Sequence, residues 1–371
     1  MSDIAQPHVV IACGGTGGHF FPGVAVAREL INAKARTTLL ISEKQVDRQT
    51  VATVPEIAHL KIPAVGMSLK RPLRFLLGLR SAIRRVRRHF SDCPPDAVLA
   101  MGGFTAVAPI RVGFQIGIPT FLHESNAVPG RANRLLSRWV DEIFIGFEEA
   151  RERFGQNQIT QSGTPVRSEF RDQNREECCK QMGFDPAKPL ILVTGGSQGA
   201  QGVNRMVVSA LPRLAEHLPN VQWLHLCGAH DLIDVKKAYN KTILRASVYD
   251  FFHDMPLALG AADLAISRSG ASSLAELAAA KAPAILVPLP TSAGDHQRVN
   301  ARTAVENGGA SMLEETKSTG DALAEQIIGL ISDTGKLMKM SNAMKSMDRP
   351  NAAQFIATRI LNACGKGVMD S

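Results

Sequence analysis

The fold is decided by the stretch His8-Val9-Val10-Ile11-Ala12-Cys13-Gly14-Gly15-Thr16-Gly17-Gly18-His19. An apolar run that predicts a buried strand breaks on glycine and then opens a helical pattern of apolar residues through Ile31. We predict that Pro22 lies near the first position of this helix, where its missing N–H costs little. A strand, a glycine turn and a helix N-terminus together present backbone N–H groups and a positive helix end to a phosphate.

The same pattern recurs about half a chain later, where Leu190–Thr194 leads into Gly195-Gly196-Ser197-Gln198-Gly199. Looser copies follow two further apolar runs, at Gly102 and at Gly270. This repeat predicts two Rossmann-like α/β halves that hold a phosphorylated ligand between them. The first loop is not a dinucleotide fingerprint, because Phe20 stands where a third glycine is needed. A nicotinamide dehydrogenase is therefore disfavoured.

Other apolar runs predict further strands, each followed by a turn and a helical pattern. They cover residues 38–42, 97–101, 120–123 and 143–146 in the first half and residues 222–227, 264–266 and 284–288 in the second. The polar stretch over residues 160–189 is typical of a linker. Residues 351–363 are expected to form a helix that crosses back onto the first half.

The composition suits a chain with two cores. It has 371 residues, of which 45% are hydrophobic and 20% charged, and the alternation of strand and helix patterns predicts α/β domains. No apolar stretch approaches the ~18 residues of a transmembrane helix, and the N-terminus has Asp3 but no basic region, which argues against a secretory signal. We therefore expect a cytoplasmic protein. Its six cysteines lack metal-ligand spacing, so we interpret them as reduced and structural.

Residues 61–90 form a strongly basic segment without Asp or Glu, and its positive charges exceed the net charge of +8 of the whole chain. These charges are Lys61, Lys70, Arg71, Arg74, Arg80, Arg84, Arg85, Arg87 and Arg88. Apolar residues from Leu76 to Phe90 recur in steps of three and four, which predicts a basic amphipathic helix. Either this helix packs on the sheet with solvated arginines, or it binds a membrane surface. Nucleic acid is less favoured, because interleaved aromatic residues are missing.

In the first half, two polar groups stand where α/β sheets place ligands. His19 is at the mouth of the first helix, and His123-Glu124-Ser125-Asn126 follows the carboxyl end of a strand. His19 is either a capping or packing residue or a general base, since a neutral imidazole can take a hydroxyl proton. The second group is either a ligand site or a loop whose side chains satisfy local backbone groups.

In the second half, Ser273 and Glu276 have the spacing of a capping box. A carboxylate one turn into a helix can alternatively bind the two hydroxyls of a ribose. Asp295 is expected to cap the following helix, which leaves His296 and Gln297 for a ligand. The chain has no Asp-x-Asp motif, which a metal-dependent transferase of the other common fold would need.

Six motifs, taken in order, resemble those of the MurG family, the lipid I N-acetylglucosaminyltransferases of peptidoglycan synthesis. They are Gly14-Gly15-Thr16-Gly17-Gly18-His19, His123-Glu124-Ser125-Asn126, Gly163-Thr164-Pro165-Val166-Arg167, Gly195-Gly196-Ser197-Gln198-Gly199-Ala200, Arg268-Ser269-Gly270-Ala271 and Asp295-His296-Gln297-x-x-Asn300-Ala301. The resemblance runs from about His8 to past Ala301. It departs from the family at Ser125, where glutamine is usual, and at Phe252, where a smaller aliphatic residue is usual beside uracil.

The resemblance implies the GT-B glycosyltransferase fold, with two Rossmann-like α/β domains facing each other across a cleft. Residues 1–165 would form the N-terminal, acceptor- and membrane-side domain, with a C-terminal helix at about 350–371 packing back on it. Residues 166–349 would form the UDP-sugar-binding domain. The implied enzyme is an inverting, metal-independent hexosyltransferase without a cofactor. It would transfer N-acetylglucosamine from UDP-N-acetylglucosamine to the 4-hydroxyl of N-acetylmuramoyl-pentapeptide-pyrophosphoryl-undecaprenol (lipid I), forming lipid II for cell-wall peptidoglycan.

The resemblance also implies site residues. Those that would bind substrate are Thr16, Gly17, Gly18, Asn126, Arg167, Ser197, Phe252, Ala271, Ser272, Ser273, Leu274, Ala275, Glu276 and Gln297. His19 is the first candidate for the general base, followed by His123 and Glu124, and no residue is assigned to a metal. The helix N-terminus after the second glycine loop can neutralise the pyrophosphate that leaves with UDP, which agrees with chemistry that needs no metal.

A polyprenyl-linked acceptor is fixed in the bilayer, which favours the membrane interpretation of the basic segment. The expected anchor consists of Leu73, Phe75, Leu76 and Leu77 with Arg71, Arg74, Arg80, Arg84, Arg85, Arg87 and Arg88 around them. We therefore expect a peripheral protein on the cytoplasmic face of the cell inner membrane. Its expected partners are UDP-N-acetylglucosamine, lipid I, an anionic membrane surface and proteins of cell-wall synthesis or division, but no nucleic acid.

Two other classes of function stay open. A UDP-N-acetylglucosamine 2-epimerase has the same two-domain architecture, but it needs paired acid–base groups at the sugar and has no use for a basic, apolar-tipped segment. A non-catalytic nucleotide-sugar-binding or membrane-scaffold protein would keep the glycine loops and dispense with a base.

Overall fold

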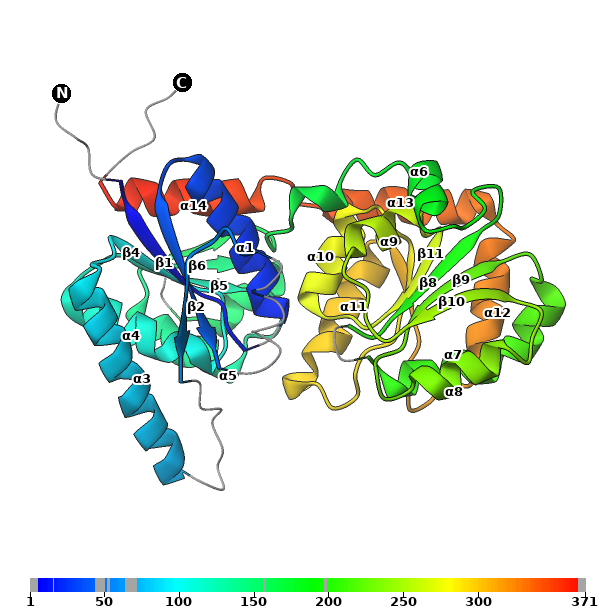
Figure 1. Ribbon diagram of the computed structural model, residues 1–371, viewed down its shortest axis with the longest axis horizontal. Coiled ribbons are helices and arrows are strands. Elements are labelled where there is room, and N and C mark those ends of the chain that lie inside the picture. The colour runs from blue at the N-terminus through cyan, green and yellow to red at the C-terminus, as the bar shows by residue number, and fades with distance from the viewer. Residues whose placement is uncertain are drawn as a thin grey trace. The chain divides into compact units, whose positions relative to one another are not determined.

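The structure is a computed structural model of the chain, and it describes residues 6–15, 17–43, 51, 54–63, 72–155, 158–196 and 199–365, with the backbone alone for residues 72–76. The chain divides into two compact units (Figure 1). The first unit comprises Met1–Arg167 and Arg349–Ser371, and the second comprises Ser168–Asp348. Some residues quoted above lie outside the described residues, namely Thr16, Lys70, Arg71, Ser197 and Gln198, as do the side chains of Leu73, Arg74, Phe75 and Leu76.

The first unit is built on a parallel sheet of order β3-β2-β1-β4-β5-β6-β7. Its strands are β1 (His8–Ala12), β2 (Arg36–Ser42), β3 (His59–Ile62), β4 (Ala97–Ala100), β5 (Thr120–Glu124), β6 (Glu142–Ile145) and β7 (Gln158–Gln161). Its helices are α1 (Gly17–Asn32), α3 (Pro72–Asp92), α4 (Val107–Ile116), α5 (Arg131–Leu136) and α14 (Ala352–Ala363). The central strands are apolar and buried, as expected where helices cover both faces of a parallel sheet.

Successive residues of β1 contribute to opposite faces of this sheet. Val9 and Ile11 belong to a core that α1 and α14 cover, and Ile356 of α14 is fully buried there. Val10 and Ala12 belong to the core on the other face, which α3 and α4 cover. The last helix of the chain is therefore part of the first unit, although the second unit precedes it in the sequence (Figure 1).

The second unit repeats this architecture on a parallel sheet of order β10-β9-β8-β11-β12-β13. Its strands are β8 (Leu190–Thr194), β9 (Gln222–Leu226), β10 (Arg245–Tyr249), β11 (Leu264–Ser267), β12 (Ala284–Leu286) and β13 (Ala310–Met312). Its helices are α6 (Arg175–Gln181), α7 (Gln201–His217), α8 (Leu232–Tyr239), α9 (Met255–Ala261), α10 (Ala271–Ala279), α11 (His296–Glu306), α12 (Gly320–Ile331) and α13 (Thr334–Met347).

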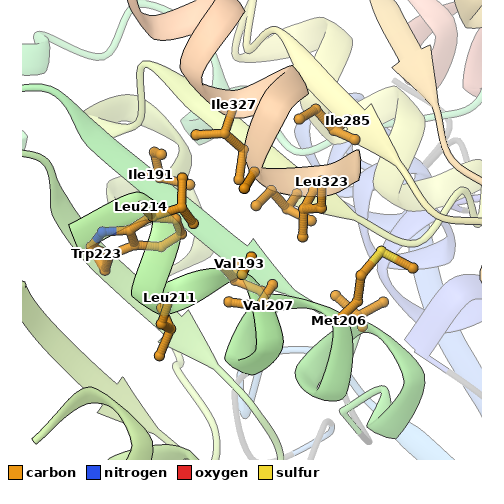
Figure 2. Packing of buried hydrophobic residues seen from close by; sticks show 14 of the residues in the cluster. Ile191, Val193, Met206, Val207, Leu211, Leu214, Trp223, Ile285, Leu323 and Ile327 are labelled. Carbon is orange, nitrogen blue, oxygen red and sulfur yellow. The ribbon is translucent and has the colours of Figure 1, made fainter. Parts of the chain in front are cut away.

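A large apolar core lies between this sheet and the helices α7 and α12 (Figure 2). Ile191 and Val193 of β8 are fully buried in it, together with Val207 of α7 and Leu323 of α12. Trp223 of β9 closes one end of the cluster and is also fully buried. This packing fixes α7 against the sheet, close to the second glycine loop, which begins where β8 ends.

Two sequence predictions about local structure are wrong. Helix α1 begins at Gly17, so Pro22 lies inside the helix and not near its first position. Residues 160–189 are not a linker throughout, because they contain the end of β7 and the helix α6. The polar composition of α6 reflects its exposed face, whereas Cys178 and Cys179 on its other face are buried.

The predicted basic amphipathic helix is confirmed as α3. Ala82, Val86 and Phe90 are buried in the core beneath it. The arginines on its other face are exposed, namely Arg80, Arg84, Arg85, Arg87 and Arg88. Leu77, near the start of the helix, is 66% exposed. Among the helices that the structure describes, none is both long and apolar enough to cross a membrane.

Candidate functional site

The first glycine loop leads from β1 into α1 and places His19 in the first turn of that helix. Gly17 and Gly18 are the first two residues of α1, and His19 is half-buried. Its ring lies beside the turn that follows β4, where a Cβ on Gly102 would stand 3.1 Å from Nε2 of His19. Gly102 has a φ of +110°, so glycine is needed there both for its backbone conformation and for the space that the imidazole occupies.

His123, near the end of β5, is buried with both ring nitrogens engaged. Nε2 lies 3.0 Å from the carbonyl oxygen of Gly163, and Nδ1 lies 3.2 Å from Oγ of Ser125. Nε2–H therefore donates to the carbonyl, and Nδ1 accepts from the Ser125 hydroxyl. Burial lowers the pKa of His123 to about 4, and the nearby His19 contributes in the same direction. The ring is consequently neutral at physiological pH.

Glu124, the last residue of β5, organises the loop that follows. Its Oε1 accepts from the backbone N–H and the side-chain amide of Asn126, at 2.8 and 3.1 Å. Its Oε2 accepts from the backbone N–H of Gly130 at 3.0 Å and from Nδ2 of Asn133 at 2.7 Å. Burial raises the pKa of Glu124, while these hydrogen bonds act in the opposite direction. The carboxyl group thereby fixes the position of Asn126.

Arg167, the last residue of the first unit before the chain enters the second, lies against α1. Its guanidinium carbon is 4.7 Å from the ring centroid of Phe21. This distance is within the range of a cation–π contact. The first unit therefore brings Arg167 to the helix that begins with Gly17, Gly18 and His19.

The second glycine loop leads from β8 into α7. Gly199 has a φ of +73°, and a Cβ there would collide with the carbonyl oxygen of Cys227, which follows β9. Helix α7 begins at Gln201, and the N-cap residue Ala200 offers no side-chain hydrogen bond to its first turn. The first N–H groups of a helix without a side-chain cap have no partner within the helix, so they can bind an anion.

The turns at the ends of β11 and β12 are tied together by polar contacts. Arg268 is 8% exposed, donates from Nη1 to the carbonyl oxygens of Val287 and Pro288, and forms an ion pair of 2.6 Å with Glu315. The hydroxyl of Ser269 donates to the carbonyl oxygen of Gln297 at 2.7 Å. These contacts hold the start of α11 against the end of β11.

Gln297 has a defined amide orientation. Its Oε1 accepts from the backbone N–H of Leu289 at 3.0 Å. Because this bond occupies the carbonyl end, the Nε2 end is the part of the amide that can donate to a ligand hydroxyl. Phe252, which follows β10, is half-buried and has its ring centroid 5.6 Å from that of Tyr249.

The capping-box interpretation of Ser273 and Glu276 is wrong. Helix α10 begins at Ala271 after the N-cap Gly270, so Ser273 already lies within the first turn and Glu276 in the second. Asp295 stands at the N-cap position of α11 as predicted, but its side chain does not cap the helix. It accepts instead from Nε of Arg298 at 2.6 Å.

No three His, Cys, Asp or Glu residues in the described ranges are grouped closely enough to hold a metal ion. Some residues that support the site are not predicted from the sequence. Asn133 donates to Glu124, and Arg268 forms an ion pair with Glu315. Asn204 in α7 is a third such residue, because it donates to the carbonyl oxygen of Cys227, against which Gly199 packs. It is buried among the apolar residues of that helix. A polar residue at an apolar helical position is the signal that could have revealed it.

The profile of the Glycosyltransferase family 28 N-terminal domain matches residues 9–145, and that of the Glycosyltransferase family 28 C-terminal domain matches residues 190–356. The chain is also 36% identical, over 94% of its length and 91% of the relative, to a protein of Anaeromyxobacter sp. (strain Fw109-5). That protein is named UDP-N-acetylglucosamine--N-acetylmuramyl-(pentapeptide) pyrophosphoryl-undecaprenol N-acetylglucosamine transferase. The chain belongs to the MurG family of glycosyltransferases.

Solved structures agree with this family and with the GT-B fold. The crystal structure of Acinetobacter baumannii MurG has a TM-score of 0.75 at 27% identity, covering 96% of this chain and all of the other. The UDP-GlcNAc 2-epimerase of Neisseria meningitidis has a TM-score of 0.69 at 15% identity, over 96% of this chain and 100% of its own. The second similarity shows the fold alone. The predicted family and fold class are confirmed.

Proposed function

We propose that the chain transfers N-acetylglucosamine from UDP-N-acetylglucosamine to lipid I and so forms lipid II. The observation that carries the proposal is the match over 94% of the chain to a transferase with that name. In the proposed reaction, a base removes the proton of the acceptor's 4-hydroxyl while its oxygen attacks C1 of the sugar from the face opposite UDP. The bond from C1 to the diphosphate oxygen breaks, and UDP leaves with the electron pair.

His19 is our candidate for the base. Both nitrogens of the His123 ring already have hydrogen-bond partners, and four N–H groups bind the carboxyl of Glu124. These two residues are therefore better suited to fix the loop that follows β5 than to exchange a proton with a substrate. His19 is half-buried in the first turn of α1, where an acceptor hydroxyl can approach it.

The second unit is proposed to bind the donor. The N-terminus of α7 would neutralise the leaving diphosphate, Glu276 would bind the ribose hydroxyls, and Nε2 of Gln297 would donate to a sugar hydroxyl. The remaining residues proposed to contact substrate are Gly17, Gly18, Asn126, Arg167, Phe252, Ala271, Ser272, Ser273, Leu274 and Ala275, with Thr16 and Ser197 outside the described residues.

The deciding experiment is UDP release from UDP-N-acetylglucosamine with and without a lipid I analogue. We expect release that depends on the acceptor, together with a disaccharide product. Isomerisation of the free nucleotide sugar would identify an epimerase, and binding without turnover would identify a scaffold. Either of these results would overturn the proposed reaction.

We also propose that the chain binds the cytoplasmic face of the inner membrane peripherally through α3. Support comes from the exposed arginines of this helix and from Leu77, which is 66% exposed. Each basic residue near an anionic surface contributes on the order of 1 kcal/mol, so several give reversible binding.

The test is co-sedimentation with liposomes across anionic-lipid content and ionic strength. Arg84→Glu/Arg85→Glu and Leu77→Ser should each reduce the bound fraction, and salt should release the wild-type protein. Ile233→Ser is the matched control, since Ile233 of the second unit is 67% exposed and lies outside the proposed surface. Binding that ignores salt and both α3 variants would contradict the proposed membrane role of α3.

A further inference from the structure

A buried network of polar side chains lies next to Gly199, the last glycine of the second glycine loop. Asn204 is in the first turns of α7 and is 2% exposed, and His225 of β9 is fully buried. Nε2 of His225 is 3.1 Å from Oδ1 of Asn204, and its Nδ1 is 3.3 Å from the hydroxyl of Tyr239 in α8. Nδ2 of Asn204 lies 2.8 Å from the carbonyl oxygen of Cys227 and 2.6 Å from Oδ2 of Asp231.

The chemistry of these groups permits one direction of donation along the network. Burial raises the pKa of Tyr239 well above its ordinary value, so its hydroxyl keeps its proton and donates to Nδ1 of His225. Burial lowers the pKa of His225 to about 3, so the ring is neutral and carries its single proton on Nε2. This proton is donated to Oδ1 of Asn204. The two acceptors of Asn204, the Cys227 carbonyl and the Asp231 carboxylate, fix its NH₂ group toward them, and its Oδ1 then accepts from His225.

This network ends at Cys227, against which Gly199 of the glycine loop packs. Asn204 donates to the carbonyl oxygen of Cys227, and a Cβ on Gly199 would collide with that same atom. The carbonyl thus contacts both the last glycine of the loop and a side chain of the helix that follows it. Asp231, just before α8, accepts the other N–H of Asn204. The residue after strand β9, Gly199 and the first turns of α7 are in this way fixed to one another.

We propose that Asn204 is a positioning residue for the donor's diphosphate. It orients the first N–H groups of α7 toward the phosphate oxygens and does not itself touch the substrate. These N–H groups would recognise the diphosphate and not the nucleoside. Loss of their orientation therefore lowers the affinity for UDP and leaves the affinity for uridine unchanged. The inference rests on the proposed function, in that it takes UDP to be the leaving group.

The test measures equilibrium binding of UDP and of uridine to the whole chain and to its variants. Asn204→Ala should lower the affinity for UDP about tenfold or more, which is the size of one lost charge-assisted hydrogen bond. The affinity for uridine should not change. Asn204→Asp keeps the size of the side chain and an acceptor for His225, but it turns the two donated bonds into repulsion with Cys227 and Asp231. It should reproduce the selective loss, and it also decides the question if Asn204→Ala does not fold.

Tyr239→Phe is the matched control, because it removes the first hydrogen bond of the network and leaves Asn204 bonded to both of its acceptors. Its UDP affinity should change by less than about twofold. A folded Asn204 variant with wild-type UDP affinity would overturn the proposal, as would an equal loss of UDP and uridine, which a merely structural role predicts. Failure of the proposed function is recognised separately, by a wild-type protein that does not bind UDP at all.

Discussion

The two glycine loops occupy corresponding places in the two units but are supported differently. The fourth residue of the helix is Phe20 in α1 and Asn204 in α7. In the register of the sheets, Ile11 of β1 faces Leu39 of β2, whereas Val193 of β8 faces His225 of β9. All of these side chains are buried. At these two corresponding positions the first unit therefore has apolar side chains, and the second has a hydrogen-bonded pair, Asn204 and His225.

This difference shows how each unit is suited to its proposed role. Apolar contacts are non-directional, whereas a hydrogen bond weakens steeply when its angle is poor. A loop that presents N–H groups to a diphosphate gains from a directional support, because preorganised donors need no rearrangement when charge develops. In the first unit the polar network is elsewhere, around Glu124 and His123, beside the proposed base.

The largest expected effect is on catalysis and comes from the first loop. His19→Ala should lower kcat by ~10²–10⁴-fold, the usual contribution of a general base. The affinity for UDP should stay nearly unchanged, since the donor is assigned to the second unit. Steady-state rates and UDP binding measured on the same preparation test both parts. Retention of more than about a tenth of kcat would argue against His19 as the base.

The buried histidines of the two units should make stability depend on pH. The pKa values of His123 and His225 are lowered from 6.5 to about 4 and about 3. The unfolded chain therefore takes up protons first as the pH falls. The stability that these neutral rings contribute is complete above pH 6.5. It decreases as the pH falls from 6.5 to about 4 for His123 and to about 3 for His225. Each ring can contribute a slope of up to ~1.4 kcal/mol per pH unit.

This slope can be measured by urea unfolding between pH 4 and pH 8 on the wild type, His123→Gln and His225→Gln. Each variant should show a smaller dependence of the free energy of unfolding on pH, whatever its stability at neutral pH. An unchanged slope in both variants would mean that neither ring is held neutral by burial.

Next in size are two effects on donor binding, which separate the ribose from the sugar. Glu276→Ala should lower the affinity for UDP itself by about tenfold, because the proposed partner of Glu276 is the ribose. Gln297→Ala should lower the affinity for UDP-N-acetylglucosamine by a similar factor and the affinity for UDP far less, since Nε2 of Gln297 is proposed to donate to the transferred sugar. Competition binding with the two ligands distinguishes these patterns. Equal losses for both ligands in both variants would contradict the assignments.

The smallest expected effect is on the apolar support of the first loop. Phe20 is fully buried, so Phe20→Leu should reduce the free energy of unfolding by ~1 kcal/mol through imperfect packing. UDP affinity should not change, in contrast to the Asn204 variants. A loss of UDP affinity in Phe20→Leu would show that the first loop also positions the diphosphate.

The sequence predicts the central strands well and misses the edges of the sheets. The predicted runs correspond to β1, β2, β4, β5 and β6 in the first unit and to β8, β9, β11 and β12 in the second. The missed strands β3, β7, β10 and β13 stand at the sheet edges. Central strands of a parallel sheet are continuous apolar runs, whereas β7, for example, is Gln-Ile-Thr-Gln and has no buried residue.

The candidate site is only partly predictable for a related reason. Motifs such as the glycine loops are local, so spacing alone indicates what they present to a ligand. The supports of these motifs are contacts between distant residues, such as Asn204 with His225 or Arg268 with Glu315. The capping-box error at Ser273 has a different cause, because the helix begins at Ala271 and not at the first residue with a capping side chain.

The second glycine loop, and not the first, is proposed to bind the donor's diphosphate. Hydrogen–deuterium exchange of the whole chain with and without UDP tests this proposal most directly, because bound N–H groups exchange slowly. We expect UDP to slow exchange in peptides covering residues 195–204 and to leave those covering residues 14–20 nearly unchanged. Slower exchange at residues 14–20, with no change at residues 195–204, would contradict the proposal.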